Sequence, residues 1–182
     1  MPPALLVRRQ YQLFIDRPPA VVFAFRADLA NHGRTAPPGQ KEEIVHGAEA
    51  PLGPGARIGF RTRQGPFGLL VTTLETEVVE WDPPHGFVIR QVRGPFAAFH
   101  HAQSFPPFQQ GTLLTDRIDY RVPLGPLGRL ADRLWLGPLL DQTFAHRQKA
   151  AKQLLEQGPK RLFKGGDPAA PAAGAARGDE GA

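Results

Sequence analysis

Hydrophobic and polar residues alternate along much of the chain, and this two-residue period is typical of β-strands. The clearest example is the segment 112–122, where Leu114, Ile118 and Tyr120 share one face with Asp116. The opposite face of the same segment is polar and charged. An apolar face that holds a single acid predicts a strand whose inner side covers something other than water.

Other extended segments are bounded by glycine and proline, which mark turns. Together they predict seven strands, over 10–16, 41–46, 57–63, 67–80, 87–93, 96–105 and 112–122. The pair Val78-Val79 interrupts the alternation of the fourth strand and predicts a β-bulge. The connections between these strands are short, so we expect the sheet to be antiparallel.

Two regions have helical spacing instead. Pro19 stands where a first helical turn tolerates proline, and it predicts a short helix over 19–30 with a second short helix before Gly33. A long C-terminal helix is predicted up to Gln157, with a kink or restart at Gly137-Pro138. Its apolar stripe is formed by Leu127, Leu130, Leu134, Leu140, Phe144, Arg147, Ala151 and Leu154.

This element order predicts an α+β fold in which a curved seven-stranded antiparallel sheet wraps around the long C-terminal helix. Two short helices follow the first strand, and a cavity is expected between helix and sheet. The expected organisation is an N-terminal extension over 1–9, one domain over 10–157 and a disordered tail over 158–182. The tail is rich in alanine, glycine and proline and buries too little apolar surface to order itself.

The inner face of the sheet supplies the candidate site. Hairpin pairing places His101 and Gln103 near Asp116 and Tyr120, as a polar cluster within an apolar wall. Three interpretations of His101 and Asp116 remain open: a buried pair that satisfies itself, a group that orients a ligand, and a catalytic acid/base pair. The predicted ligand-binding residues are Phe60, Leu70, Thr72, Phe99, His101, Gln103, Phe105, Leu114, Asp116, Ile118, Tyr120, Leu140 and Phe144.

Several short motifs in the same region resemble a known family. They are Trp81-x-Pro83-Pro84-His85-x-Phe87, Gly94-Pro95-Phe96, Phe99-His100-His101-x-Gln103-x-Phe105 and Thr115-Asp116-x-Ile118-x-Tyr120. Over about 11–156 the chain is similar to the SRPBCC family of the START-like, helix-grip superfamily, which includes polyketide cyclases and aromatase-like domains. The resemblance implies the helix-grip fold. The family often has a second histidine where this chain has Gln103, a change that favours hydrogen bonding over proton transfer.

Composition and charge narrow the function classes. The chain has 182 residues, no cysteine and no apolar run of the roughly 18 residues that a membrane span needs. We therefore expect a cytoplasmic protein without disulfides or a transmembrane segment. The net charge of +5 is spread along the chain, so no specific nucleic-acid binding is expected.

No metal site or cofactor is predicted. His100 and His101 are neighbours on a strand and point to opposite faces, so they cannot hold one ion together. The remaining histidines stand in loop, turn or helix positions without carboxylate partners at ligand spacing: His32, His46, His85 and His146. Trp135 and Leu136, beside Gly137-Pro138, are expected to belong to the core, and the alternative is that they form a lid over the cavity.

These observations favour the binding of a small hydrophobic ligand, lipid-, polyketide- or isoprenoid-like, without catalysis. One alternative is a cyclase or dehydratase that acts on an aromatic polyketide-like substrate with His101 and Asp116 as acid and base. Another is an interaction module in which the basic segment 160–164 contacts a membrane or a protein. The oligomeric state stays open.

Overall fold

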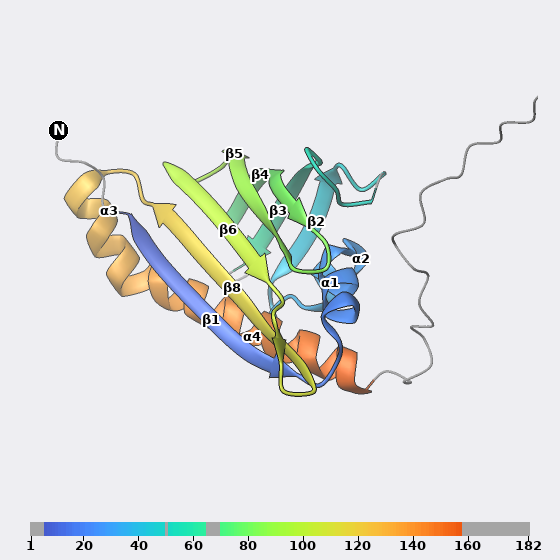
Figure 1. Ribbon diagram of the computed structural model, residues 1–182. Coiled ribbons are helices and arrows are strands. Elements are labelled where there is room, and N and C mark those ends of the chain that lie inside the picture. Colours follow the sequence, from blue (N-terminus) through green and yellow to red (C-terminus); the bar gives the residue numbers. More distant parts are fainter. Residues whose placement is uncertain (1–5, 50, 65–69, 158–182) are drawn as a thin grey trace, which may run out of the picture.

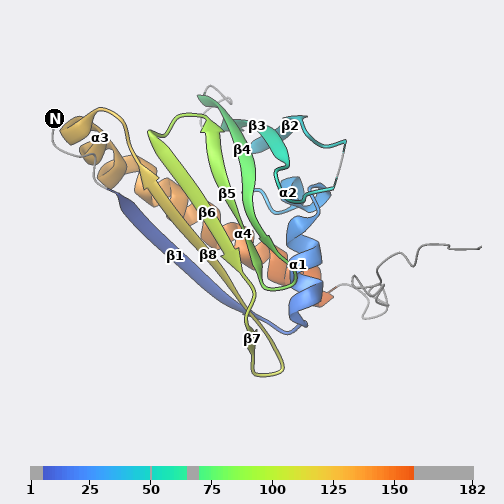
Figure 2. The ribbon, with the colours of Figure 1, turned by 45° about the horizontal axis from the view of Figure 1, so that its top comes forward.

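An antiparallel sheet curves around one long helix in the computed structural model, which describes residues 6–49, 51–64 and 70–157 (Figures 1 and 2). The strand order is β1-β8-β6-β5-β4-β3-β2, and the two-residue β7 pairs with β8. The strands are β1 (Val7–Ile15), β2 (Lys41–His46), β3 (Arg57–Gln64), β4 (Leu70–Asp82), β5 (Gly86–Arg93), β6 (Ala98–Ser104), β7 (Pro107–Phe108) and β8 (Gly111–Arg121). The predicted α+β helix-grip architecture is confirmed.

The helices lie where the sequence places them. They are α1 (Pro19–Ala27), α2 (Ala30–Arg34), α3 (Gly125–Ala131), the π-helical turn η2 (Asp132–Leu136) and α4 (Gly137–Gln157). Pro19 occupies the first turn of α1, where its missing N–H costs no hydrogen bond. The break that Gly137-Pro138 predicts takes the form of the π-helical turn directly before it. Within the described residues, no helix is both long and apolar enough to cross a membrane.

One detail of the strands differs from the sequence prediction, and another confirms it. The first strand begins at Val7 instead of Gln10, because β8 is long enough to pair with it as far as Val7 opposite Tyr120. The register of β4 against β5 shifts between Val78 and Glu80, which confirms the predicted bulge. Residues 1–5 and 158–182, which include most of the predicted extension and the whole predicted tail, lie outside the described residues.

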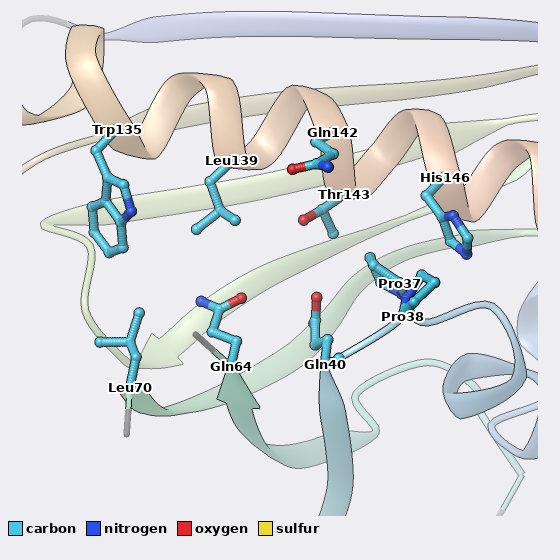
Figure 3. A pocket seen from close by; sticks show the side chains of 11 residues that line it. Pro37, Pro38, Gln40, Gln64, Leu70, Trp135, Leu139, Gln142, Thr143 and His146 are labelled. Atoms are coloured by element: carbon cyan, nitrogen blue, oxygen red, sulfur yellow. The ribbon is translucent and has the colours of Figure 1, made fainter. Parts of the chain in front are cut away.

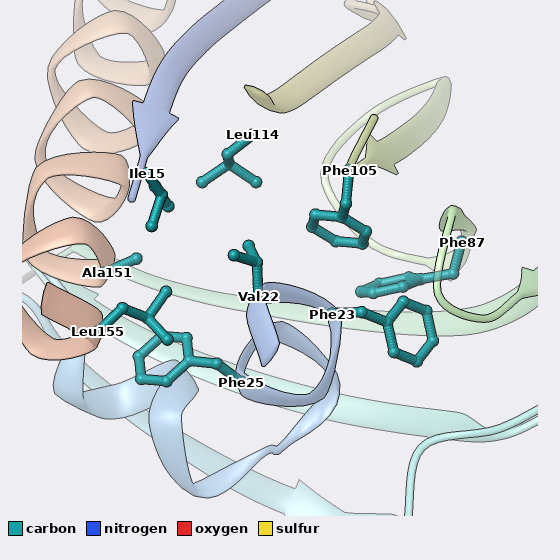
Figure 4. Packing of buried hydrophobic residues seen from close by; sticks show 9 residues of the cluster. All are labelled: Ile15, Val22, Phe23, Phe25, Phe87, Phe105, Leu114, Ala151 and Leu155. Carbon is teal, nitrogen blue, oxygen red and sulfur yellow. The ribbon is translucent and has the colours of Figure 1, made fainter. Parts of the chain in front are cut away.

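A hydrophobic core joins α1 to the sheet and to the C-terminal half of α4 (Figure 4). The ring of Phe23 meets Phe87 and Phe105 edge-on, with centroid distances of 5.9 and 5.7 Å. A second cluster brings Ile118 and Tyr120 of β8 together with Phe144 of α4. These two clusters fix the helix against the sheet at both ends of the space that forms the site.

The helical stripe predicted from Leu127 onward is wrong in its first part. Leu127, Leu130 and Leu134 are exposed, whereas Gly128 and Asp132 are buried. The π-helical turn is the physical reason, because its i→i+5 spacing shifts the inward face by one residue. The inward positions therefore step from 128 to 132 and then to 137, where an unbroken α-helix would place 136. Gly128 packs so closely that a Cβ would collide with the Pro123 carbonyl oxygen.

Candidate functional site

A cavity lies between the concave face of the sheet and α4, and it has two parts. The inner chamber has a volume of about 180 Å³ and the outer chamber about 350 Å³. Both are bordered by Phe96, Leu140 and Thr143, so the two chambers adjoin. The wall of the inner chamber is mainly apolar and includes Ile58, Phe60, Leu74, Phe87, Ile89, Phe96, Phe99, Leu140 and Phe144.

A polar cluster forms one end of the inner chamber, with the buried carboxylate of Asp116 at its centre. His101 Nε2 lies 2.7 Å from Asp116 Oδ1, and Arg26 Nη2 donates to the same oxygen at 3.1 Å. Gln148 of α4 donates to Asp116 Oδ2 at 2.8 Å. The cluster thus joins α1, β6, β8 and α4 at one buried point.

The surroundings of Asp116 keep it ionised. Burial raises the pKa of its carboxyl, but the charge of Arg26 and the hydrogen bonds from His101 and Gln148 outweigh burial. The pKa of Asp116 therefore lies well below its ordinary value. An ionised carboxylate only accepts hydrogen bonds, so His101 Nε2 carries the proton that it shares with Asp116. This fixes the orientation of the imidazole at the cavity wall.

Arg26 has N–H donors that the described residues do not use. Its Nε donates to Gln103 Oε1 at 2.7 Å, and Nη2 is used by Asp116. Its Nη1 has no hydrogen-bond partner among the described residues, and Arg26 lines the inner chamber. Since a guanidinium carries five N–H donors, at least one is available to a molecule in the cavity.

A second polar cluster borders the same chamber. Arg147 Nη2 pairs with Glu42 Oε2 at 2.6 Å, and its Nη1 donates to the His32 carbonyl oxygen at 3.0 Å. His32 Nδ1 lies 2.8 Å from Glu42 Oε2, so the expectation that His32 lacks a carboxylate partner is wrong. Strand β2 brings Glu42 to α2, a proximity that sequence spacing does not reveal.

The surroundings of Glu42 and His32 also determine the protonation states of these two side chains. Burial raises the pKa of Glu42, but His32 and Arg147 lower it more strongly, to about 2. Burial lowers the pKa of His32 and so favours its neutral form, which stacks on Phe60 at a centroid distance of 4.5 Å. Each of the two buried carboxylates therefore has one arginine as its counter-ion: Arg26 for Asp116 and Arg147 for Glu42.

The structure brings together part of the predicted ligand-binding set. Six of its members line the inner chamber: Phe60, Phe99, His101, Gln103, Leu140 and Phe144. Leu70 and Thr72 border the outer chamber instead. Asp116 lies behind His101 and Arg26 and does not line the cavity.

Four other members of that set are core residues instead of cavity wall. Phe105 and Leu114 are covered by α1, because they pack in the cluster that contains Val22 and Phe23. Ile118 and Tyr120 are covered by α4 and pack in the second cluster. Alternation correctly predicts that these side chains point inward, but it does not tell which inward positions a helix covers.

Five residues of the two polar clusters were not predicted as site residues: Arg26, His32, Glu42, Arg147 and Gln148. The sequence carries a signal for Arg147, since it falls on the apolar stripe of the long helix where a solvated arginine is not expected. Gln148 follows it directly and is buried as well. Arg26 and Glu42 give no such signal, because their burial depends on how α1 and β2 pack.

A cleft leads into the cavity between α4 and the edge of the sheet formed by β2, β3 and β4 (Figure 3). Trp135, Leu139 and Thr143 line its helical side, facing Gln40, Gln64 and Leu70. The cleft has a volume of about 480 Å³ and shares these six residues with the outer chamber.

Trp135 is about half exposed at this cleft, so its expected place in the core is wrong. The π-helical turn that contains it again explains the difference, since it shifts the inward face of the helix by one residue. Within the described parts of the chain, no three His, Cys, Asp or Glu side chains are grouped to hold a metal ion.

Comparison with solved structures shows the same fold. TTHA0849 from Thermus thermophilus superposes with a TM-score of 0.65 at 20% identity, covering 83% of this chain and 98% of that one. The Zhui aromatase/cyclase from a Streptomyces species gives 0.65 at 15% identity, covering 84% and 95%. A norcoclaurine synthase point mutant from Thalictrum gives 0.61 at 16% identity, covering 85% and 96%. No curated protein sequence matches significantly.

A match to a family model identifies the family of this chain, which likeness to distantly related structures does not. The family described as "Polyketide cyclase / dehydrase and lipid transport" matches residues 8–156, which include every strand from Arg8 onward and nearly all of α4. The matched segment contains both chambers of the cavity and both polar clusters. The chain belongs to the polyketide cyclase / dehydrase and lipid transport family.

Proposed function

We propose that this protein binds a small hydrophobic ligand in the cavity between the sheet and α4. The observation that carries the proposal is an apolar cavity with a guanidinium donor, Arg26 Nη1, that the described residues leave without a partner. Ligand sites usually combine an apolar wall with a few polar groups that fix orientation. Their volumes are roughly 300–1,000 Å³, and the outer chamber alone reaches that range at about 350 Å³.

The charges of the cavity indicate which polar group the ligand carries. Arg26 offers a donor, and a carbonyl, enol or phenol oxygen on the ligand would accept from it. A carboxylate is less suitable, since Asp116 and Glu42 are already ionised close by and their charges are balanced by Arg26 and Arg147. The ligand class is therefore a mainly apolar molecule, lipid-, polyketide- or isoprenoid-like, with a neutral oxygen at its inner end.

The comparisons are consistent with this class. The family description names both lipid transport and polyketide cyclase or dehydrase activity. The Zhui aromatase/cyclase has the same fold but only 15% identity, so its likeness supports the fold and not its activity in this chain.

The test is binding of an apolar fluorescent probe, together with native mass spectrometry of the protein purified from its own host. Leu140→Trp should fill space where the two chambers meet and lower probe affinity at least tenfold, because Leu140 borders both. Leu134→Trp is the matched control, since Leu134 is exposed and borders neither chamber. Equal affinity of Leu140→Trp and the native protein would refute binding in this cavity.

One observation favours a second candidate function, a cyclase or dehydratase. His101 lines the cavity and its ring is oriented by the ionised Asp116, an arrangement that general acid–base catalysis uses. Replacing His101 by Gln keeps hydrogen-bonding capacity and removes proton transfer. If His101 is a general acid or base, His101→Gln should lower turnover of the co-purified ligand by roughly 100- to 10,000-fold with similar affinity. We expect no turnover by either protein.

A further inference from the structure

Five large apolar side chains within twelve residues are exposed on α3, its N-cap residue and η2. They are Leu124 (78% exposed), Leu127 (73%), Leu130 (55%), Leu134 (70%) and Trp135 (54%). We call these residues the leucine surface. We propose that the leucine surface docks onto an anionic lipid surface. This inference rests on the proposed function, because docking would let an apolar ligand pass between a bilayer and the cavity.

The exposed charge on the segment that carries the leucine surface is positive. Between Val122 and Leu140 the chain has three charged residues: Arg129, Asp132 and Arg133. Asp132 is buried and accepts a hydrogen bond from the Tyr120 hydroxyl at 2.6 Å, so it does not face solvent. Both arginines are exposed, and neither forms an ion pair with any residue that the structure describes. An apolar face flanked by unpaired arginines complements anionic lipid headgroups.

The leucine surface is continuous with the wall of the cavity. Leu124 and Trp135 border the outer chamber as well as being exposed, and Trp135 also borders the cleft (Figure 3). The same short helical segment therefore faces solvent on one side and the ligand space on the other. A bilayer covering this segment would lie next to the opening through which an apolar ligand enters.

The residue types favour lipid over a protein partner. Helices that lie in a membrane interface place leucine and tryptophan on one face and arginine or lysine beside them, as here. Protein interfaces also use tryptophan and arginine, but they usually carry about one hydrogen bond per 100–200 Å² between polar groups. The leucine surface has no exposed hydrogen-bonding group other than the Trp135 indole and the two arginines within 127–135.

The experiment is vesicle co-sedimentation at low and high salt. One set of vesicles is pure phosphatidylcholine, and the other contains about one third phosphatidylglycerol. Leu127→Glu/Leu134→Glu changes the surface only, because neither leucine borders a chamber. Arg129→Gln/Arg133→Gln removes the charge. Phe108→Glu is the control, since Phe108 is an exposed apolar residue at the β7–β8 end, opposite α3 (Figure 2).

We expect the native protein to sediment with the anionic vesicles and to be released by high salt. The leucine double variant should lose at least tenfold in partitioning. The arginine double variant should lose about fivefold per arginine on anionic vesicles, with little change on neutral ones. Phe108→Glu should bind as the native protein does. Thermal unfolding should be unchanged in every surface variant, which shows that the fold is intact.

Several outcomes would overturn the proposal. Absence of native binding to both vesicle types would do so, and so would equal binding by the leucine double variant. A native dimer that becomes a monomer in the leucine double variant, without vesicle binding, would assign the surface to self-association instead. Probe binding without vesicles tests the proposed function separately, because the leucine double variant leaves both chambers unchanged.

Discussion

Gln148 donates a hydrogen bond to Asp116 Oδ2 at 2.8 Å, and this bond joins α4 to the centre of the sheet. The same amide nitrogen donates to the Tyr11 carbonyl oxygen at 3.0 Å, so both of its N–H groups are used. The side chain of Gln148 is buried, and no water can replace it without opening the helix–sheet contact. The polar end of the cavity therefore depends on how the long helix is seated.

Replacing Gln148 by Leu should lower the free energy of unfolding by roughly 2–3 kcal/mol, because it removes a hydrogen bond to a buried charge. Urea denaturation measures this loss. Gln142→Leu is the matched control on the same helix, and its effect should stay within about 0.5 kcal/mol since Gln142 is exposed. Equal effects of the two changes would mean that the bond between Gln148 and Asp116 contributes nothing to stability.

Glu42 should make stability depend on pH in the acid range. Its pKa in the folded protein is about 2, below the ordinary value of 4.5, so the ionised form favours the folded state. Its contribution, roughly 3 kcal/mol, is complete above pH 4.5 and is lost as pH falls from there towards pH 2. We expect Glu42→Gln to be less stable than the native protein at pH 7, with a difference that shrinks below pH 4.5.

Denaturant unfolding at a series of pH values measures this difference. Glu43→Gln is the control, because Glu43 is the exposed neighbour of Glu42 on β2. A gap between native protein and Glu42→Gln that stays constant from pH 7 to pH 3 would show that the pairing with Arg147 does not stabilise the fold.

Phe144 and Leu140 should differ in their contribution to stability although they are one turn apart. Phe144 is buried, stacks on Tyr11 at 5.4 Å and meets His101 edge-on at 5.1 Å. We expect Phe144→Ala to cost roughly 3–5 kcal/mol. Both side chains line the inner chamber, but Leu140 is only partly buried, so Leu140→Ala should cost less, about 1–2 kcal/mol. Thermal and urea unfolding measure both, and a larger cost for Leu140→Ala would contradict this difference in burial.

The buried hydrogen bond between Tyr120 and Asp132 should stabilise the folded state. Burial and Asp132 raise the pKa of Tyr120 to about 12, so its hydroxyl remains a donor at all ordinary pH values. Tyr120→Phe leaves the buried Asp132 carboxylate without its side-chain donor and should cost roughly 2–3 kcal/mol in urea unfolding.

The double variant Tyr120→Phe/Asp132→Leu serves as the control for this prediction. It removes both partners of this hydrogen bond and should recover part of the loss, because no unpaired carboxylate remains, although Arg9 Nε still loses the Tyr120 hydroxyl that it donates to at 3.0 Å. If the double variant is less stable than Tyr120→Phe, the carboxylate of Asp132 has another role in the turn.

The sequence predicts the sheet well because alternation reports directly on which side of a strand is buried. The inward positions His101, Gln103 and Asp116 and the bulge at Val79 follow from this pattern. Sequence patterns predict the site less well. Arg26 and Glu42 meet the cavity only because α1 and β2 pack around it, and no local pattern encodes that packing.

The long helix shows a second limit of sequence reasoning. A regular 3.6-residue period predicts that Leu130 and Phe144 share one face, since they are fourteen residues apart. In the structure Phe144 is buried and Leu130 is exposed, because the π-helical turn lies between them. Gly137-Pro138 indicates an irregularity at that point, but it does not tell whether the turn becomes tighter or wider.

The π-helical turn also determines how this chain can change through insertion and deletion. A π-helical turn is an α-helical turn with one additional residue, so losing one residue from 132–136 would restore a continuous α-helix. In that α-helix Gly137 would follow Asp132 at a spacing of four residues, so Gly128, Asp132 and Gly137 would still share the inward face. A deletion of one codon would therefore remove the π-helical turn while Leu127 and Leu130 stay exposed and α4 keeps its place on the sheet.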